Sequence, residues 1–462
     1  MSVDIAVVGG GPSGLFAALG LIRAFEGLTV KVYERAQSYR ECGAGITLDV
    51  NGMKALRAVD EELYAKFQST VVTDVSQMQS FDQHGEPIGD RSTVSMKTII
   101  DNIKQKTGVG MGMIGWFDIQ QMIFDALPEG TVEFGHAFTD LAEEADGLSL
   151  TFENKPPVKA KYMVGADGYF SPVREILHHD GPPEFTDTVM WRARFPWKPD
   201  SGLPKGPDFV HSFSGGRLQG LVYGLPGDVV CWILSAPVDL CEAQGVEYDQ
   251  AQHSRSKQRR QISSYQNADE GQGLSAHTRC LKVAEIAAPQ MQELVKLTDP
   301  GAIIEHGLFV RQAGELDKYA ETGWGKGRIT LIGDAAHPMR PTGQGMNTAL
   351  EDGAVLAWHL QHGGLCEEAM RAFERERIPR VKSMAEQEYA RGATAYKEDA
   401  RAALDRVKTL PMSEQDFSDF NLSFHPSTLM DSWPTVIELT FWRGFVVVAP
   451  TLFDPPLAFA AA

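Results

Sequence analysis

The first part of the chain alternates apolar runs of strand length with segments whose apolar residues repeat at helical spacing. Residues 3–8 read as a buried strand, residues 12–22 as a helix and residues 28–33 as a second strand. A strand, a tight turn, a helix and a second strand are typical of a parallel βαβ unit. Short strand patterns follow at residues 131–134, 147–152 and 162–164. The sequence therefore predicts an α/β fold that begins with a Rossmann-like unit.

Strand-like patterns also dominate a long insertion in the middle of the chain. They cover residues 188–195, 208–213, 219–224 and 228–235. We expect them to form a second sheet that covers the nucleotide-binding part. After Pro338 the pattern turns helical, over residues 347–361, 365–394 and 398–408.

The predicted organisation is interleaved rather than sequential. Residues 1–70, 110–182 and 300–360 would assemble a discontinuous nucleotide-binding domain. Residues 71–109 and 183–299 would form a β-sheet substrate domain. Residues 361–462 would form a C-terminal helical region.

Charged residues are dense on the predicted helix 365–394. Arginines and glutamates stand three or four positions apart, which on a helix brings them side by side. We interpret them as a solvated, salt-bridged helix face. The residues concerned are Arg371, Glu374, Arg375, Glu376, Arg377 and Arg380.

Composition and charge narrow the class of protein. The 462 residues are 43% hydrophobic, which is enough for large cores, and the net charge is -18. That charge argues against nucleic acid or an anionic membrane as the main partner. Five cysteines without a CxxC pair indicate neither a disulfide framework nor a metal site. We find no signal peptide and no membrane span, and expect a cytoplasmic monomer or homodimer.

A glycine motif occupies the turn between the first strand and the first helix. It reads Gly9-x-Gly11-x-x-Gly14, and Glu34 ends the second strand about 20 residues later. Gly9 permits the tight turn, Gly11 lets the backbone approach a pyrophosphate, and Gly14 lets the helix pack on the strand. The helix N-terminus offers N–H groups to the phosphate charge, and Glu34 suits a ribose hydroxyl.

Two further strands end in an aspartate. Residues 162–164 run into Gly165-Ala166-Asp167-Gly168, and residues 328–332 run into Gly333-Asp334. Gly343 to Asn347 then opens a helix with glycines at Gly343 and Gly345. The N–H groups of such a helix start favour negative charge on a flat ring that lies against it.

These segments together resemble the single-component, FAD-dependent aromatic monooxygenases, the group that includes salicylate hydroxylase and related hydroxybenzoate hydroxylases. The resemblance covers residues 1 to about 395 and implies a Rossmann-like FAD-binding domain interleaved with a β-sheet substrate domain. It also implies non-covalent FAD and NADH or NADPH as the electron donor. Gly9, Gly11, Gly14 and Glu34 would hold the ADP half of FAD.

The resemblance also assigns roles at the flavin end. Asp334 would bind the ribityl chain, and Met346 and Asn347 would contact the isoalloxazine through their backbone, with Gly343 and Gly345 beside them. Asp167 would serve the pyrophosphate and the nicotinamide cofactor. Pro341 would lie beside the ring where oxygen is activated. Arg192, in the Trp191-Arg192 pair, would face the active site or cofactor, although a domain-interface ion pair is an equal alternative.

One position departs from the family. The family usually has an arginine that reaches the FAD phosphates two residues before an aspartate, and here Trp116 precedes Asp118. Arg35 and Arg40 are the nearest candidates to meet the phosphate charge instead. We expect Arg40→Ala to weaken FAD binding.

The implied reaction is insertion of one oxygen atom from O2 into an electron-rich substrate through a flavin C4a-hydroperoxide. A phenol or aromatic acid is the expected substrate, and His211 and Tyr223 are candidates for a base or hydrogen-bond acceptor near its hydroxyl. Resemblance to zeaxanthin epoxidase around Cys231-Trp232 keeps epoxidation of an isoprenoid alkene as an alternative. A non-redox binding protein with the flavoprotein fold is a more remote one.

Overall fold

The computed structural model describes residues 2–41, 43–72, 75, 77–88, 101, 104–105, 107–215, 217–247, 275–311, 313–339 and 343–395. Pro341 and the expected helix 398–408 lie outside the described residues.

The first sheet confirms the predicted Rossmann-like unit. Its strands have the order β7-β2-β1-β10-β9-β8. Strand β16 pairs with the last residues of β10, beyond the end of β9 and on the side opposite β1. Strands β7, β2, β1, β10 and β16 are parallel, while β8 and β9 form an antiparallel hairpin on β10. Their bounds are β1 Ser2–Val8, β2 Val30–Glu34, β7 Val132–Phe134, β8 Phe138–Glu144, β9 Gly147–Phe152, β10 Val158–Gly165 and β16 Ile329–Leu331.

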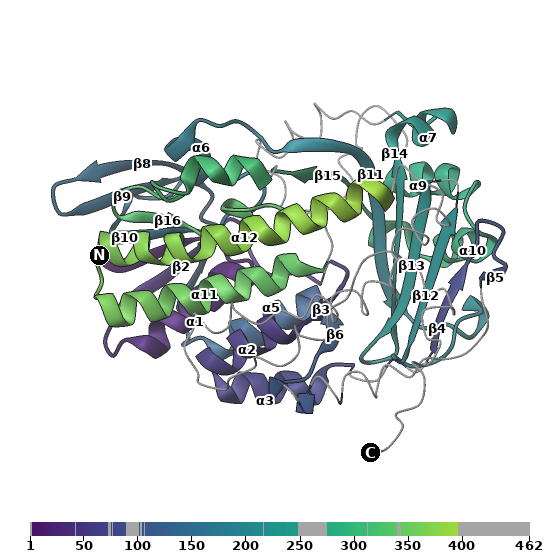
Figure 1. Ribbon diagram of the computed structural model, residues 1–462, viewed down its shortest axis with the longest axis horizontal. Helices are drawn as coiled ribbons and strands as arrows, with labels where there is room; N and C mark the ends of the chain where they lie inside the picture. The colour runs from purple at the N-terminus through teal and green to yellow at the C-terminus, as the bar shows by residue number, and fades with distance from the viewer. Residues whose placement is uncertain are drawn as a thin grey trace, which may run out of the picture.

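Helices pack around this sheet. In Figure 1, α1, α11 and α12 lie side by side as one layer, and α2 and α3 continue from it beyond α1. Gly20 of α1 and Gly353 of α11 allow close approach, because a Cβ at Gly353 would lie 2.9 Å from the Phe16 ring. The bounds are α1 Pro12–Ala24, α2 Val50–Val59, α3 Glu61–Thr70, α5 Trp116–Ala126, α6 Pro172–His178, α11 Gln344–Gly363 and α12 Glu367–Ala395.

The second sheet confirms the predicted strand-rich insertion. Its order is β15-β11-β14-β13-β12-β4-β5, and β15 extends it past residue 299, where the sequence-based division ended. The ribbon of β3 and β6 lies between the two sheets (Figure 1). The bounds are β3 Gly45–Leu48, β4 Gln77–Phe81, β5 Pro87–Ile88, β6 Gly112–Gly115, β11 Glu184–Pro196, β12 Phe209–Gly215, β13 Leu218–Leu225, β14 Val229–Pro237 and β15 Ile304–Val310.

Short helices complete the second unit and the connections. Helices α9 and α10 pack on the second sheet, α7 follows β14, and four 3-10 turns join other elements. The bounds are α7 Val238–Ala243, α9 Ala276–Ala284, α10 Pro289–Leu297, η1 Pro199–Ser201, η2 Pro300–Ala302, η3 Ala313–Tyr319 and η4 Gly333–Ala335.

The two faces of the second sheet have different neighbours, because alternate residues of a strand point to opposite sides. Trp191 and Trp232 lie on the face that packs against α9 and α10, which we call the outer face. Tyr223 and Cys231 lie on the opposite face and pack against Ala44 and Met113 near β3 and β6. We call this the inner face, since it is directed toward the first sheet and its loops.

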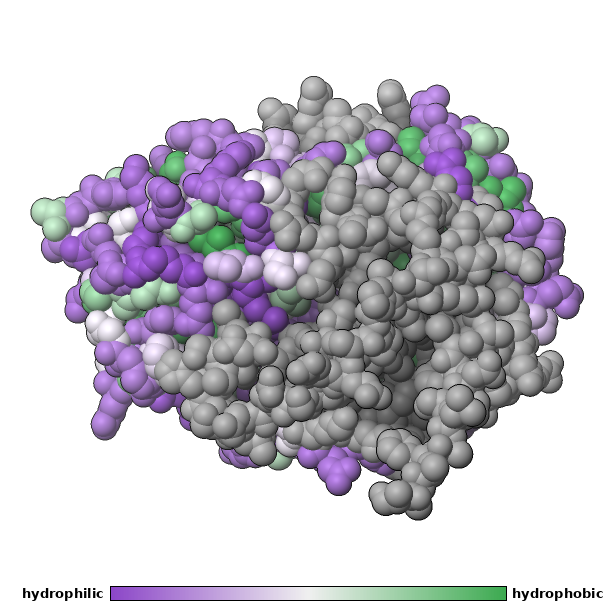
Figure 2. Space-filling model, in the orientation of Figure 1, coloured by the Kyte–Doolittle hydropathy of each residue, from purple (hydrophilic) through white to green (hydrophobic). Residues whose placement is uncertain are grey.

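The charged face predicted for α12 is only partly solvated. Arg375 has a side chain 50% exposed, in agreement with the prediction, but the side chains of Arg377 and Glu374 are 0% exposed. The prediction was wrong for these two because α12 packs on other elements: Arg377 pairs with Glu351 and Asp352 of α11, and Glu374 accepts from Thr330 of β16 as well as from Arg371 of α12. Figure 2 shows a mainly hydrophilic surface on the left of the view, where α12 and the β8–β9 hairpin lie. In the part of the chain that the structure describes, none of the helices is long and apolar enough to cross a bilayer.

Candidate functional site

The glycine turn after β1 is shaped for an anionic ligand. Gly9 has φ +109°, and an added Cβ there would lie 2.3 Å from the Ala166 carbonyl oxygen. An added Cβ at Gly14 would lie 2.0 Å from the Gly9 carbonyl oxygen. Gly11, the residue before α1, has no atom within 4 Å of its Cβ position. The turn therefore leaves open space in front of the N–H groups that begin α1.

Glu34 and two other side chains hold this turn in place. The Glu34 carboxylate accepts hydrogen bonds from the Gly10 N–H at 2.7 Å and from the Ala36 N–H at 2.8 Å. The Gly10 carbonyl accepts from the Tyr39 hydroxyl at 2.8 Å and from Gln120 Nε2 at 2.9 Å. The backbone that would meet a pyrophosphate is thus fixed before a ligand binds, and Tyr39 and Gln120 are contributors that the sequence analysis missed.

Asp167 and Asp334 end the neighbouring parallel strands β10 and β16, so both lie at the edge of the sheet where β1 meets the glycine turn. Asp167 accepts hydrogen bonds from the Ser171 hydroxyl and from the Val173 N–H. Burial raises the pKa of Asp167 to about 6, against the lowering effect of Ser171. Burial likewise raises the pKa of Asp334 to about 6, although the nearby His337 lowers it. A ligand hydroxyl that donates to either carboxylate would stabilise its ionised form.

Arg35 and Arg40 are both exposed. Arg35 lies close enough to Asp167 for its charge to lower the pKa of that carboxyl. The structure therefore places Arg35 near Asp167, at the end of the first sheet where β1, β10 and β16 terminate. Arg40 lies on the surface between Tyr39 and β3.

The start of α11 forms the other end of the site. Gly343 caps the helix with φ +98°, and Gly345 has no atom within 4 Å of its Cβ position. The Asn347 side chain is buried and accepts from the Asp49 N–H at 2.8 Å while it donates to the Thr47 carbonyl at 3.0 Å. The side chain of Asn347 therefore anchors the helix to β3 and α2, and the backbone around Gly345 and Met346 stays open to a planar ligand.

The inner face of the second sheet supplies a wall opposite this loop. Residues paired across antiparallel strands share a face. Arg192 pairs with Ile233, Ile233 with Leu221, and Met190 with His306. Polar and apolar side chains are thus mixed on this wall, and the structure places Arg192 on it.

His211 does not belong to the wall. It lies on the outer face with Phe209 and Phe213, and its ring is 5.3 Å from the rings of both Phe81 and Phe209. Burial among these aromatics lowers the pKa of His211 to about 4. His211 is therefore a half-buried residue packed among aromatic rings, and His306, half-buried on the inner face, is a candidate that the sequence analysis did not name.

Tyr223 lies on the inner face, but its hydroxyl is already engaged. It donates to the Gly45 carbonyl at 3.0 Å, and the residue is only 3% exposed. Burial raises the pKa of Tyr223 well above its usual range. Tyr223 thus stays neutral and joins the second sheet to β3, which is a poor arrangement for a base.

Trp116 begins α5 beside the glycine-rich segment at Gly43. Its N–H donates to the Ala44 carbonyl at 2.9 Å, and a Cβ at Gly43 would lie 3.1 Å from its Cβ atom. Arg194, on the inner face, reaches the same helix start, with ion pairs to Asp118 at 3.4 Å and Glu41 at 3.1 Å. Positive charge therefore does lie near α5, although it comes from the second sheet.

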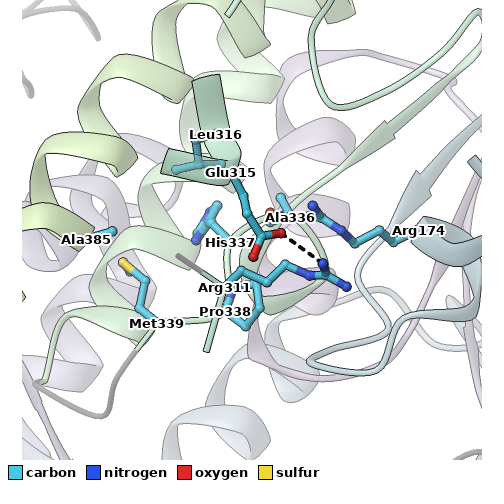
Figure 3. Close-up of a pocket in the computed structure, with 9 residues that line it drawn as sticks. All are labelled: Arg174, Arg311, Glu315, Leu316, Ala336, His337, Pro338, Met339 and Ala385. Carbon is cyan, nitrogen blue, oxygen red and sulfur yellow. Dashed lines mark hydrogen bonds and ion pairs between the residues drawn. The ribbon is translucent and has the colours of Figure 1, made fainter. Parts of the chain in front are cut away.

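A small hollow is lined by the segment His337–Met339 and residues around it (Figure 3). Arg174 and Arg311 line it, and both are already paired, Arg311 with Glu315 at 3.1 Å and Arg174 with Asp180 at 2.8 Å. Arg174 also donates to the Ala336 carbonyl at 2.6 Å. These arginines fix the chain that leads from Asp334 toward α11 rather than form a free anion site.

Comparison with known proteins agrees with this geometry. The family model described as "FAD binding domain" matches residues 2–226 and 284–388. The 3-amino-4-hydroxybenzoate 2-monooxygenase PtmB3 of Streptomyces platensis is 29% identical over 414 residues, which cover 89% of this chain and 93% of that protein. The 6-hydroxynicotinate 3-monooxygenase of Bordetella bronchiseptica is 28% identical over 387 residues, 82% of this chain and 88% of that protein.

Solved structures share the fold. Klebsiella pneumoniae HpxO complexed with FAD and uric acid has a TM-score of 0.67 at 19% identity, covering 93% of this chain and 97% of that chain. The 2,6-dihydroxypyridine-3-hydroxylase of Arthrobacter nicotinovorans has a TM-score of 0.65 at 19% identity, covering 85% and 92%. The glycine turn, Asp167, Asp334 and the open start of α11 agree with these matches. The chain belongs to the family described as "FAD binding domain" and is an FAD-dependent monooxygenase.

Proposed function

We propose that the enzyme hydroxylates a phenol or an aromatic acid, with NADH or NADPH as the electron donor. The observation that carries the proposal is the mixed character of the inner face. Relatives of this chain that act on hydroxylated aromatic acids, such as 3-amino-4-hydroxybenzoate and 6-hydroxynicotinate, support it.

The inner face carries apolar side chains that can pack against a ring and polar side chains that can bind the substituents of that ring. Met190, Leu221 and Ile233 provide apolar surface, while Arg192 and His306 stand directly beside them in the register. A guanidinium suits a carboxylate or phenolate, and an imidazole suits a phenol hydroxyl. An isoprenoid alkene carries no anionic group or hydroxyl for the guanidinium and the imidazole to recognise. We therefore favour an aromatic substrate over the epoxidation of an alkene.

The residues at the edge of the first sheet fit FAD. Gly11 leaves the space that a pyrophosphate needs, Glu34 and Asp167 can serve the ADP half, and Asp334 can accept from the ribityl hydroxyls. Gly345 and Met346 would face the isoalloxazine ring. When bound, FAD supplies the redox chemistry that lets O2 be split between product and water. The expected contact of Pro341 falls on residues outside those the structure describes.

We assign the substrate-binding roles accordingly. Arg192 would orient an anionic substituent, and His306 would hold the proton of the hydroxyl that activates the ring. The apolar side chains of the same face would exclude water from the reacting carbon.

The test is the anaerobic visible spectrum of the FAD-loaded enzyme while NADH or NADPH is added, with and without a panel of phenolic acids and small terpenoids. We expect slow bleaching alone and fast bleaching with a phenol or aromatic acid. Fast bleaching with a terpenoid only would replace the aromatic proposal by epoxidation. A yellow protein that neither nucleotide bleaches under any condition would refute the use of NADH or NADPH.

A further inference from the structure

One arginine on α12 connects the two loops that form the flavin end of the site. The side chain of Arg377 is 0% exposed. Its Nε donates to Asp352 at 2.7 Å, its Nη1 donates to Glu351 at 2.7 Å, and its Nη2 donates to the Thr348 carbonyl at 3.3 Å. All three partners lie on α11.

Asp352 extends this network to the turn that carries Asp334. Its other carboxylate oxygen accepts from the Gly333 N–H at 2.8 Å and from His337 Nε2 at 2.6 Å. Gly333 and His337 lie on either side of Asp334. The position of Asp352, set by Arg377, therefore sets the position of the aspartate that faces the ribityl chain.

The rest of the network leads to the start of α11. The Thr348 hydroxyl donates to the Gln344 carbonyl at 2.7 Å, and Gln344 Nε2 donates to Asp49 at 2.5 Å. Thr348, whose carbonyl Arg377 contacts, is therefore bonded to Gln344 at the start of α11. The Arg377 guanidinium thus reaches the start of α11 through Thr348 and the Gly333 turn through Asp352.

The charges of this network are buried, so each of them needs its partner. Glu351 and Asp352 are both 0% exposed. Against the effect of burial, Arg380 and Arg377 lower the pKa of Glu351, and His337 and Arg377 lower the pKa of Asp352. Removal of one member of a buried ion cluster leaves an uncompensated charge that the surrounding chain must move to accommodate. Here the groups bonded to that cluster are the Gly333 turn and the start of α11.

We propose that Arg377 is a positioning residue for FAD binding. Arg377 acts through Asp352 and Thr348 to hold the Asp334 turn and the start of α11 in fixed positions relative to each other. Because its side chain is 0% exposed and bonded to α11, Arg377 would act through these residues and not by direct contact with FAD. Couplings transmitted in this way change binding by about 2- to 30-fold, so we expect Arg377→Met to weaken FAD binding by about tenfold.

The experiment titrates FAD into flavin-free protein, with quenching of flavin fluorescence as the readout, and records visible circular dichroism of the FAD-saturated protein. Arg377→Met removes the charge, and Arg377→Lys keeps the charge but loses the fork that contacts two carboxylates at once. The matched control is Arg279→Met, which breaks a partly buried ion pair with Glu305 at 2.8 Å near the outer face of the second sheet.

We expect both Arg377 variants to weaken FAD binding, Lys less than Met, and to alter the circular dichroism of bound flavin. Arg279→Met should lower stability while FAD affinity and the flavin spectrum stay within about twofold of wild type. If Arg377→Met does not fold, Arg377→Lys alone decides. Wild-type FAD affinity and circular dichroism in every folded Arg377 variant, or an equal loss in Arg279→Met, would overturn the proposal and leave Arg377 as a purely structural residue.

Discussion

A methyl group added at Gly11 should have a different consequence from one added at Gly14, three residues away. Gly11 has φ −68° and ψ 170°, which alanine adopts without strain, and its Cβ position faces open space. Gly14 lies in α1, where the new Cβ would be 2.0 Å from the Gly9 carbonyl oxygen. Because a backbone atom cannot rotate away as a side chain can, the helix or the turn must shift.

The two magnitudes follow from these surroundings. Overpacking of this kind typically costs about 1–3 kcal/mol, so Gly14→Ala should lower the free energy of unfolding of the flavin-free protein by at least that much. Gly11→Ala should leave it unchanged or raise it by about 0.5 kcal/mol, because alanine restricts the unfolded chain. In Gly11→Ala the methyl occupies the space that the pyrophosphate needs, and the same 1–3 kcal/mol there weakens FAD binding by about 5- to 150-fold.

Both quantities can be measured on the same flavin-free preparations. Urea unfolding gives the free energy of unfolding, and flavin fluorescence gives the Kd for FAD. We expect Gly11→Ala to keep the wild-type free energy of unfolding but to raise the Kd for FAD. Gly14→Ala should instead lower the free energy of unfolding. Wild-type FAD affinity in Gly11→Ala would show that the open space before α1 is not where the pyrophosphate binds, and would refute the reasoning.

Three further predictions concern charged and polar groups of the site. Since burial raises the pKa of Asp334 from 3.8 to about 6, the folded flavin-free protein keeps a proton that the unfolded chain has lost between these pH values. The free energy of unfolding should therefore fall as pH rises from about 4 to 6, with Asp167 contributing in the same direction. In urea unfolding curves, Asp334→Asn should make this dependence less steep while the part that comes from Asp167 remains. His211→Phe should leave kcat/KM within about twofold of wild type, whereas His306→Phe should lower kcat/KM at least about tenfold in steady-state assays with the best substrate; the reverse order would restore His211 to the site. Arg40→Ala should weaken FAD binding by no more than about fivefold, because Arg40 is exposed, and full flavin retention after dialysis would exclude even that role.

Local motifs were enough to predict which residues meet at the carboxyl-terminal end of the first sheet. The glycine turn follows β1, and Asp167 and Asp334 stand just past the ends of β10 and β16, so their positions depend on each strand and its neighbour alone. The parallel pairing of β1, β10 and β16 then brings them to one edge of the sheet. No long-range information was required beyond the rule that ligands bind at that edge.

The substrate end could not be predicted in the same way, because the face of a strand depends on what covers it. His211 alternates with Phe209 and Phe213, and this aromatic periodicity already indicated a packed face. Which of the two faces is directed toward the first sheet depends on α9 and α10, which cover the other face and follow later in the sequence. His306 joined the wall only through the register of β15 on β11, which no local pattern of β15 specifies.

The end of the FAD-binding domain has a physical definition that differs from the predicted boundary at residue 360. Helix α12 begins at Glu367, yet its Arg377 neutralises Glu351 and Asp352, which are buried on α11. A chain that ended before α12 would keep two buried carboxylates without their main counter-charge, and burial of a charge without a partner is among the most destabilising changes a core can suffer. The family match, which continues to residue 388, agrees that α12 is part of the domain. We therefore infer that the nucleotide-binding domain needs α12 to bind FAD, and that Arg377, on the helix face predicted to be solvated, joins α12 to α11.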